Sequence, residues 1–316
     1  MEIFFFLMVS TIICFLMSYI SGLTVLFAIL WGTCLIISSL YLDKPKLVLV
    51  FTVNLGTLYL LTEINSLFFY VSFFGLAALV MCLLIIKNKD YYYLQKWGLI
   101  TAVAGVSVFL CVIFLSTGDI GIKELEEQLV AYTSEVIQVY EENGILEIYQ
   151  QQGILKDDLE KSMYGLASSV AKHLPALYYL QAILAVFFML LFASWVSLKR
   201  NLERLKKRPY IEEIMPWQLV WVVIAGLFLW LVGRNEMSLI FYAGSNILLI
   251  MAPIAVYFGL GALLFRIKQN SPNKGKRLTI LLVVIAVLFP LSAIIFLGIL
   301  GLFDALLDFR KLRIEE

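Results

Sequence analysis

Histidine and charged residues are scarce in this chain. One histidine is present, and lysine, arginine, aspartate and glutamate together make up 15% of the 316 residues. Soluble domains carry roughly 25% charged residues. A soluble fold of this length could not cover its apolar surface with so few polar side chains. The shortage of charge therefore excludes a wholly soluble protein and leaves lipid as the solvent for much of the surface.

Cysteine is present at four positions, but in no arrangement that indicates chemistry. Cys14, Cys34, Cys82 and Cys111 all lie within apolar runs, none belongs to a CxxC pair, and none is close in sequence to His173. This pattern argues against a disulfide framework and against a metal site. It indicates that the four cysteines serve as small, buried, apolar side chains.

The common catalytic and nucleotide-binding motifs are also missing. The chain has no GxxxxGK[ST] loop for ATP phosphates, no HExxH zinc motif and no GxSxG serine elbow. We therefore expect no cofactor, no metal and no enzyme activity, and we expect no nucleic-acid partner. Any driven transport through the protein would take its energy from a gradient or from a partner protein.

Long apolar runs dominate what is present. Hydrophobic residues make up 62% of the chain, and its mean hydropathy is +0.93. A helix needs roughly 20 residues to cross a hydrocarbon core of about 30 Å. Runs of about that length cover residues 3–20, 23–42, 46–62, 66–86, 97–116, 174–198, 217–233, 239–265 and 278–303. The sequence thus predicts an all-α, polytopic membrane bundle of about nine transmembrane helices. Eight is the alternative, because the run from 3 to 42 would also fit one span and a re-entrant piece.

Basic residues mark one end of this predicted bundle. They gather in the short loops around 44–46, 87–96, 199–208 and 266–277. The nine-span model puts all four loops on one side, which the positive-inside rule assigns to the cytoplasm together with the N-terminus. One feature disagrees, because an odd number of spans puts the cations Arg310, Lys311 and Arg313 outside. Either nearby acids balance these cations, or Pro290 breaks the last run, or one span is miscounted.

The hydrophilic segment 117–173 has the opposite charge. It contains eleven acids and four lysines, a net charge of −7. Apolar residues from Ile122 to Tyr140 recur every three or four positions, and a similar run follows from Leu155 to Val170, which is the spacing of amphipathic helices. We predict two helices, broken near Asn143-Gly144 and Gly153, that form an extracytoplasmic cap. They would pack on each other or along the outer interface, or serve as a lid over a substrate entrance.

The predicted organisation has three parts. Residues 1–116 form a five-span membrane bundle, 117–173 form the acidic helical cap, and 174–316 form a four-span membrane region. The cap separates the two membrane regions.

Four polar residues within or next to the spans are candidates for function. Asn54, Gln181 and Asn246 lie inside predicted spans, and Arg234 lies at a short outer turn. Intramembrane polar groups are often functional, but neutral amides also hydrogen bond neighbouring helices together. Both readings of the amides stay open. Arg234 is either a solvated interfacial charge or half of an ion pair at a cavity mouth.

The decapeptide Gly301–Arg310 contains three further candidates. If Asp304 and Asp308 continue the last helix, their spacing of four puts both carboxylates on one face, so a cationic partner is expected. Arg310 can pair with Asp308 only if the helix ends near Phe309. Otherwise the partner comes from another segment, with Arg234 as a candidate. We interpret the group as a structural clasp, with a substrate site as the alternative.

Several landmarks of the second half follow one another in a recognisable order. They are Leu174-Pro-Ala-Leu177, the basic run 199–208, Met215-Pro-Trp-Gln-Leu-Val-Trp221, Gly244-Ser-Asn246, Gly259-Leu260 and the decapeptide 301–310. This order resembles a bacterial membrane protein family called domain of unknown function 2232. The resemblance is good from about 170 to 312 and weak in the N-terminal spans. It implies a multi-pass protein of the bacterial cytoplasmic membrane.

The resemblance also carries a functional implication. The family is distantly grouped with the substrate-binding components of energy-coupling-factor vitamin transporters, which are six-helix bundles that work with a coupling subunit and cytoplasmic ATPases. The N-terminal spans would then form the related bundle. This chain departs from that pattern in its larger number of spans, its acidic cap, and the lack of an alanine-rich docking motif on the first span.

Two functions follow from these observations. The first is a small-molecule transport or substrate-capture component without its own ATPase, which would bind a small ligand and work with membrane or cytoplasmic protein partners. The second is a non-transporting scaffold or sensor, in which the cap and the basic loops bind protein partners.

Overall fold

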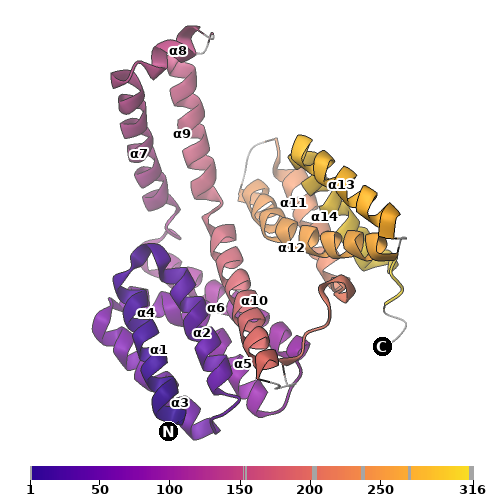
Figure 1. Cartoon of the computed structure of the whole chain (residues 1–316). Coiled ribbons are helices and arrows are strands. Elements are labelled where there is room, and N and C mark those ends of the chain that lie inside the picture. The colour runs from indigo at the N-terminus through magenta and orange to yellow at the C-terminus, as the bar shows by residue number, and fades with distance from the viewer. Residues whose placement is uncertain are drawn as a thin grey trace. The chain divides into compact units, whose positions relative to one another are not determined.

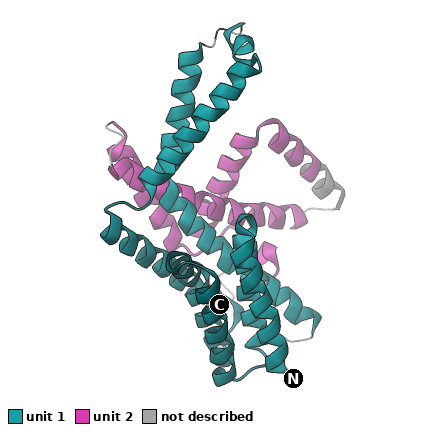
Figure 2. Ribbon diagram, turned by 90° about the vertical axis from the view of Figure 1, so that its left-hand side faces the viewer, with its two compact units in different colours: residues 1–207 teal, residues 208–316 magenta. Residues whose placement is uncertain are grey.

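The computed structural model describes residues 2–151, 153, 155–200, 205–235, 239–269 and 272–312, with the backbone alone for 272–278. All regular elements in these ranges are helical (Figure 1), as predicted. The contacts divide the chain into two compact units, unit 1 of residues 1–207 and unit 2 of residues 208–316 (Figure 2).

Six helices of membrane-spanning length and composition lie in the described part of unit 1. They are α1 (Glu2–Tyr19), η1 with α2 (Ser21–Leu23 and Thr24–Ser38), α3 (Lys44–Leu61), α4 with η2 and α5 (Ile64–Tyr70, Val71–Gly75 and Leu76–Ile86), α6 (Tyr91–Thr117) and α10 (Leu174–Lys199). The first 42 residues therefore form two helices, α1 and α2, which pack against each other.

The core of unit 1 joins α10 to the N-terminal helices. Met189 of α10 packs over Gly32 of α2, where a Cβ atom would collide with the methionine sulfur. A Cβ atom on Gly105 of α6 would likewise collide with the carbonyl oxygen of Ser72. The first close approach joins α10 to α2, and the second joins α6 to η2. The units thus divide at 207, whereas the predicted division fell at 174.

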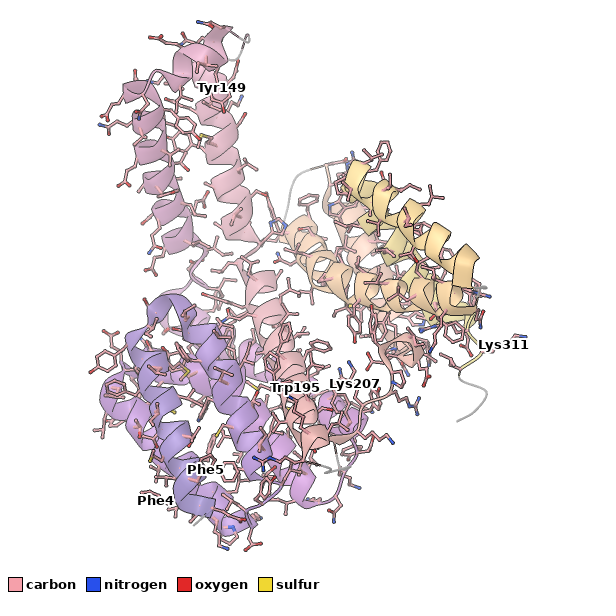
Figure 3. All side chains as sticks on the ribbon, viewed as in Figure 1. Phe4, Phe5, Tyr149, Trp195, Lys207 and Lys311 are labelled. Atoms are coloured by element: carbon pink, nitrogen blue, oxygen red, sulfur yellow. The ribbon has the colours of Figure 1, made fainter. Side chains whose placement is uncertain are left out.

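Residues 117–173 form a helical hairpin within unit 1, which we call the acidic hairpin. Its helices are α7 (Ile122–Glu142), the short α8 (Ile145–Gln151) and α9 (Lys156–Lys172). Gly144 and Gly153 adopt positive φ angles at the two breaks. The helices pack on each other and rise away from the bundle, with Tyr149 at the tip (Figures 1 and 3). The two helices therefore pack on each other, which is one of the predicted arrangements.

Unit 2 is built around a seam of small residues. Its helices are α11 (Gln218–Gly233), α12 (Leu239–Gln269), α13 (Pro272–Leu288) and α14 (Pro290–Leu307), preceded by the 3-10 turn η4 (Tyr210–Glu212). Gly259 of α12 lies against the carbonyl oxygen of Leu297, and Gly301 of α14 lies against that of Ala255. Small residues let the two backbones touch.

The predicted ninth span, 278–303, is wrong as one continuous helix. The chain breaks at Phe289 (φ −132°, ψ 65°), because Pro290 has no N–H for the helical ladder. Helix α13 runs back along the unit, and α14 then runs parallel to α12 (Figure 1). Helices α12 and α14 end next to each other, because Arg266 Nη2 near the end of α12 donates to the carbonyl oxygen of Phe309, just after α14, at 3.2 Å.

This break removes the charge conflict in the predicted topology. Arg310 and Lys311 lie at the end of α12 that carries Arg266 and Lys268, so these two C-terminal cations lie with the basic residues of that end. Among the described residues, eight helices are long and apolar enough to span a membrane, and α11 is shorter at 16 residues. Many apolar side chains point outward, as Phe4 and Phe5 do (Figure 3), which suits contact with lipid.

The direction of α14 leads to a labelling prediction. In intact cells, a cysteine at Gln150 should react with a membrane-impermeant maleimide, and a cysteine at Lys311 should react only after permeabilisation. Both are tested in a Cys111→Ser background. Equal labelling of the two positions in intact cells would contradict the return of α13.

Candidate functional site

The decapeptide forms a buried clasp at the end of α14. The helix ends at Leu307, and Asp308 takes up a left-handed conformation with φ 44°. Aspartate tolerates this conformation because its short polar side chain bonds locally. Here Asp308 Oδ1 accepts from the N–H of Leu312 at 3.1 Å. The reversed chain carries Arg310 back over the last turn of the helix.

Arg310 reaches three groups at once. Its Nε and Nη2 donate to Asp304 Oδ2 at 3.0 and 2.7 Å. Its Nη1 donates to the carbonyl oxygen of Ile211 at 2.6 Å, and Nη2 also donates to that of Glu213 at 2.7 Å. Arg310 and Asp304 are 5% and 1% exposed. A buried guanidinium is tolerated only when it is paired and hydrogen-bonded, and this one is both.

The segment that Arg310 holds has its own contacts with α12. Tyr257 donates to Glu213 Oε2, and Tyr210 donates to the carbonyl oxygen of Tyr257. Burial raises the pKa of Tyr210, and the nearby Glu213 carboxylate raises it further. The clasp thus ties the end of α14, the loop at 210–213 and α12 into one polar cluster.

Two expectations about the decapeptide are wrong. Asp304 and Asp308 do not share a face of a continuing helix, because the helix stops before Asp308. Arg234 is not the partner either. It is exposed at the end of α11, with its guanidinium 5.6 Å from the Trp230 ring centroid. Since α14 ends beside the end of α12, the turn at Arg234 lies at the opposite end of these helices.

A second candidate site is a cleft in unit 1. It has a volume of about 430 Å³ and is open to the surface. Its lining comes from the four helices α2, α4, α6 and α10: Thr24, Val25, Asn65, Ser66, Phe69, Tyr70, Phe109 and Gln181. All of these lie near the bundle end from which the acidic hairpin rises, since α2, α4 and α10 begin there and α6 ends there.

The cleft combines neutral hydrogen-bonding groups with aromatic rings. Hydroxyl and amide side chains line one part of it, and no lining residue is charged. The Phe69 and Phe109 rings meet edge to face at 5.7 Å, and both contact Phe73 below. Apolar walls with a few polar groups are typical of small-molecule sites. Next to Tyr70, residues Val71–Gly75 form a π-helical turn, a feature frequent at functional sites.

The structure treats the three predicted amides differently. Gln181 lies in the cleft. Asn54 is buried, and its Oδ1 accepts from Ser10 at 3.1 Å and Thr11 at 3.4 Å, so it joins α3 to α1. Asn246 Nδ2 donates to the carbonyl oxygen of Tyr242 at 2.7 Å, one turn back in its own helix. Of the three amides, Gln181 is the one that lines this cleft.

Sequence reasoning missed the other polar lining residues. Thr24, Asn65 and Ser66 lie at the starts of predicted helices, where polar residues ordinarily meet solvent. The available signal was the aromatic run from Phe68 to Phe74 that follows Asn65-Ser66. An aromatic cluster below neutral polar groups is a composition that suits a binding cleft.

Comparisons with known proteins place the chain in a family without indicating an activity. Searches of curated proteins and of solved structures each gave no significant match. A family model described as a predicted membrane protein, DUF2232, matches residues 8–305. The match includes Asp304 and extends through the N-terminal helices, where the resemblance in the sequence is weak. The chain therefore belongs to the DUF2232 family of predicted membrane proteins.

Proposed function

We propose that unit 1 is a substrate-capture bundle that binds a small, uncharged molecule in the cleft around Gln181. The observation that carries the proposal is the convergence of neutral polar and aromatic side chains from four helices on one open cleft. With no charged side chain in the lining, a charged ligand would lose its hydration without gaining a partner. A neutral ligand with hydrogen-bonding groups on an apolar or ring framework fits this lining better.

The bundle's architecture supports the proposal. The resemblance noted in the sequence implies a six-helix substrate-binding bundle, and unit 1 has six membrane-length helices among its described residues. The cleft opens at the end that the charge pattern assigns to the outside, where a captured molecule would arrive. Release to the other side would take its energy from a gradient or from a partner protein, because the chain has no GxxxxGK[ST] loop for ATP.

Gln181→Leu tests the cleft directly. The purified full-length protein is screened against uncharged small molecules for ligand-induced thermal stabilisation. A ligand at about 100 times its Kd stabilises its target by about 2.7 kcal/mol. Leucine keeps the volume of the side chain and removes its hydrogen bonds, so we expect affinity to fall about tenfold or more. The matched control is Gln218→Leu at the start of α11, which should bind as the parent does.

Two outcomes would refute the proposal. One is that no uncharged molecule stabilises the parent. The other is that Gln181→Leu and Gln218→Leu bind a stabilising molecule equally well.

A scaffold or sensor is the second candidate function, and the acidic hairpin favours it. This hairpin presents apolar side chains to solvent outside the membrane-length helices. A surface of this kind serves contacts with protein, and the proposal that follows concerns its occupant.

A further inference from the structure

The acidic hairpin uses one side of each helix for its own packing. Thr133 and Ile137 of α7 are buried against α9, and Ala167 and Ala171 of α9 are buried in return. The register is antiparallel. Ser134 Oγ lies 3.1 Å from Tyr164 Oη, and further along Lys156 Nζ lies 2.8 Å from Glu141 Oε2. These contacts fix which residues face outward.

A second face of the hairpin is apolar and open. Tyr132 and Leu166 each come one residue before a buried position, and they are 65% and 66% exposed. Successive residues of a helix are turned by about 100°. The two helices of the hairpin are right-handed and antiparallel. In each of them, the residue that comes just before an inward-facing residue therefore lies on the same flank of the hairpin. Val139 and Val170 extend this flank at 50% and 46% exposed. We call these four residues the uncharged face.

The charges of the hairpin avoid this face. In α7, the residues reached from Leu125 to Val139 in alternating steps of four and three positions are all apolar. The same is true in α9 from Leu159 to Val170. The eleven acids of segment 117–173 lie at other positions. An apolar face this long on a segment of net charge −7 is exposed to water unless something covers it.

The hairpin's own bilayer is a poor occupant. Helix α9 leads directly into the membrane helix α10, and both views show the hairpin standing clear of the bundle (Figures 1 and 2). Its face therefore points sideways rather than down onto lipid. Amphipathic helices that lie on membranes carry lysine and arginine on their polar side. The polar side here is acidic, and anionic lipid would repel it.

A second copy of the chain meets the geometry. Copies in one membrane share an orientation, so each presents its uncharged face sideways at the same height. A two-fold axis parallel to the hairpins brings α7 of one copy against α9 of the other. Tyr132 then lies level with Leu166 of the second copy, and the acids stay outside. We propose that two chains pair through the uncharged face to form an antiparallel four-helix bundle beyond the membrane.

Cross-linking in membranes tests the pairing. Single variants Tyr132→Cys and Leu166→Cys are co-expressed in a Cys111→Ser background and oxidised. We expect a covalent dimer in the mixed sample, and much less with either variant alone. The control pair, Ala131→Cys with Gly165→Cys, comes two residues before the buried positions, on the outer edge of each helix and off the uncharged face, and should give no dimer. Gly165 has nothing within 4 Å of a Cβ position, so its substitution is tolerated.

Charge substitution tests the same face in the purified full-length protein. Native mass spectrometry in lipid nanodiscs should show a dimer for the parent. Tyr132→Glu with Leu166→Glu should weaken dimerisation about tenfold or more, because carboxylates would be buried at the seam. Ala131→Glu with Gly165→Glu adds the same charge on the outer edges of the hairpin, off the uncharged face, and should leave the dimer intact.

Helix content by circular dichroism should be equal in all three proteins, since the substituted positions are exposed. A monomeric parent without cross-links would overturn the proposal. So would a dimer that survives both substitutions on the uncharged face, or one that the control pair abolishes equally.

Discussion

Replacing Arg310 with alanine is expected to lower the free energy of unfolding of unit 2 by about 3–5 kcal/mol. This is the usual cost of leaving a buried charge without its partner. The substitution strands the Asp304 carboxylate, which is 1% exposed and whose Oδ1 has no hydrogen-bond partner among the described residues. It also frees the carbonyl oxygens of Ile211 and Glu213. Chemical or thermal unfolding of the detergent-solubilised protein measures the loss.

Two further variants separate geometry from charge at the clasp. Arg310→Lys keeps the charge but lacks the planar guanidinium, whose three nitrogens donate to separately placed acceptors, so it should recover only part of the lost stability. Lys311→Ala removes an exposed neighbouring cation and should change stability by less than about 0.5 kcal/mol. If Arg310→Ala is as stable as the parent while binding of a ligand or partner is lost, the clasp is a functional site and not a structural one.

Replacing Gly259 with alanine should have the second largest effect. A Cβ atom there would collide with the carbonyl oxygen of Leu297 and lie 3.0 Å from the amide nitrogen of Gly301. Backbone atoms cannot rotate away, so α12 and α14 must separate. Overpacking usually costs about 1–3 kcal/mol, and leucine at this position should cost more. Unfolding of the solubilised protein again provides the measurement.

Gly298→Ala is the matched control on α14. Its Cβ would meet only Val256 Cγ2 at 3.8 Å, an ordinary van der Waals contact. Because alanine is a better helix former than glycine by up to about 1 kcal/mol, this variant should be as stable as the parent or slightly more so. Equal effects of the two substitutions would mean that the seam between α12 and α14 is not closely packed.

The membrane helices were predictable because lipid imposes a simple rule on sequence. A span needs a long apolar run, and the runs between residues 3 and 265 all coincide with helices. The last run was harder to interpret, because Leu288 to Leu291 contains no polar residue to mark a turn. Proline marked the break, but apolar residues on both sides concealed the reversal. The conflict in the C-terminal charges was the second indication in the sequence that the chain reverses there.

The site residues were harder to predict, because they depend on packing. The pairing of Asp304 with Arg310 spans six residues, and it requires the left-handed turn at Asp308 that no helical spacing rule contains. The cleft brings together residues as distant as Thr24 and Gln181. Gln181 was identifiable because an amide inside an apolar run is unusual. Polar residues at helix starts carry no comparable signal.

Native mass spectrometry of the intact protein, released from lipid nanodiscs without prior delipidation, tests the central claim most directly. If unit 1 captures a small molecule, the parent should carry an uncharged adduct small enough for a cleft of about 430 Å³. Gln181→Leu should lose this adduct, and Gln218→Leu should keep it. Detection of lipids alone on the parent, or an adduct retained equally by all three proteins, would contradict capture in this cleft.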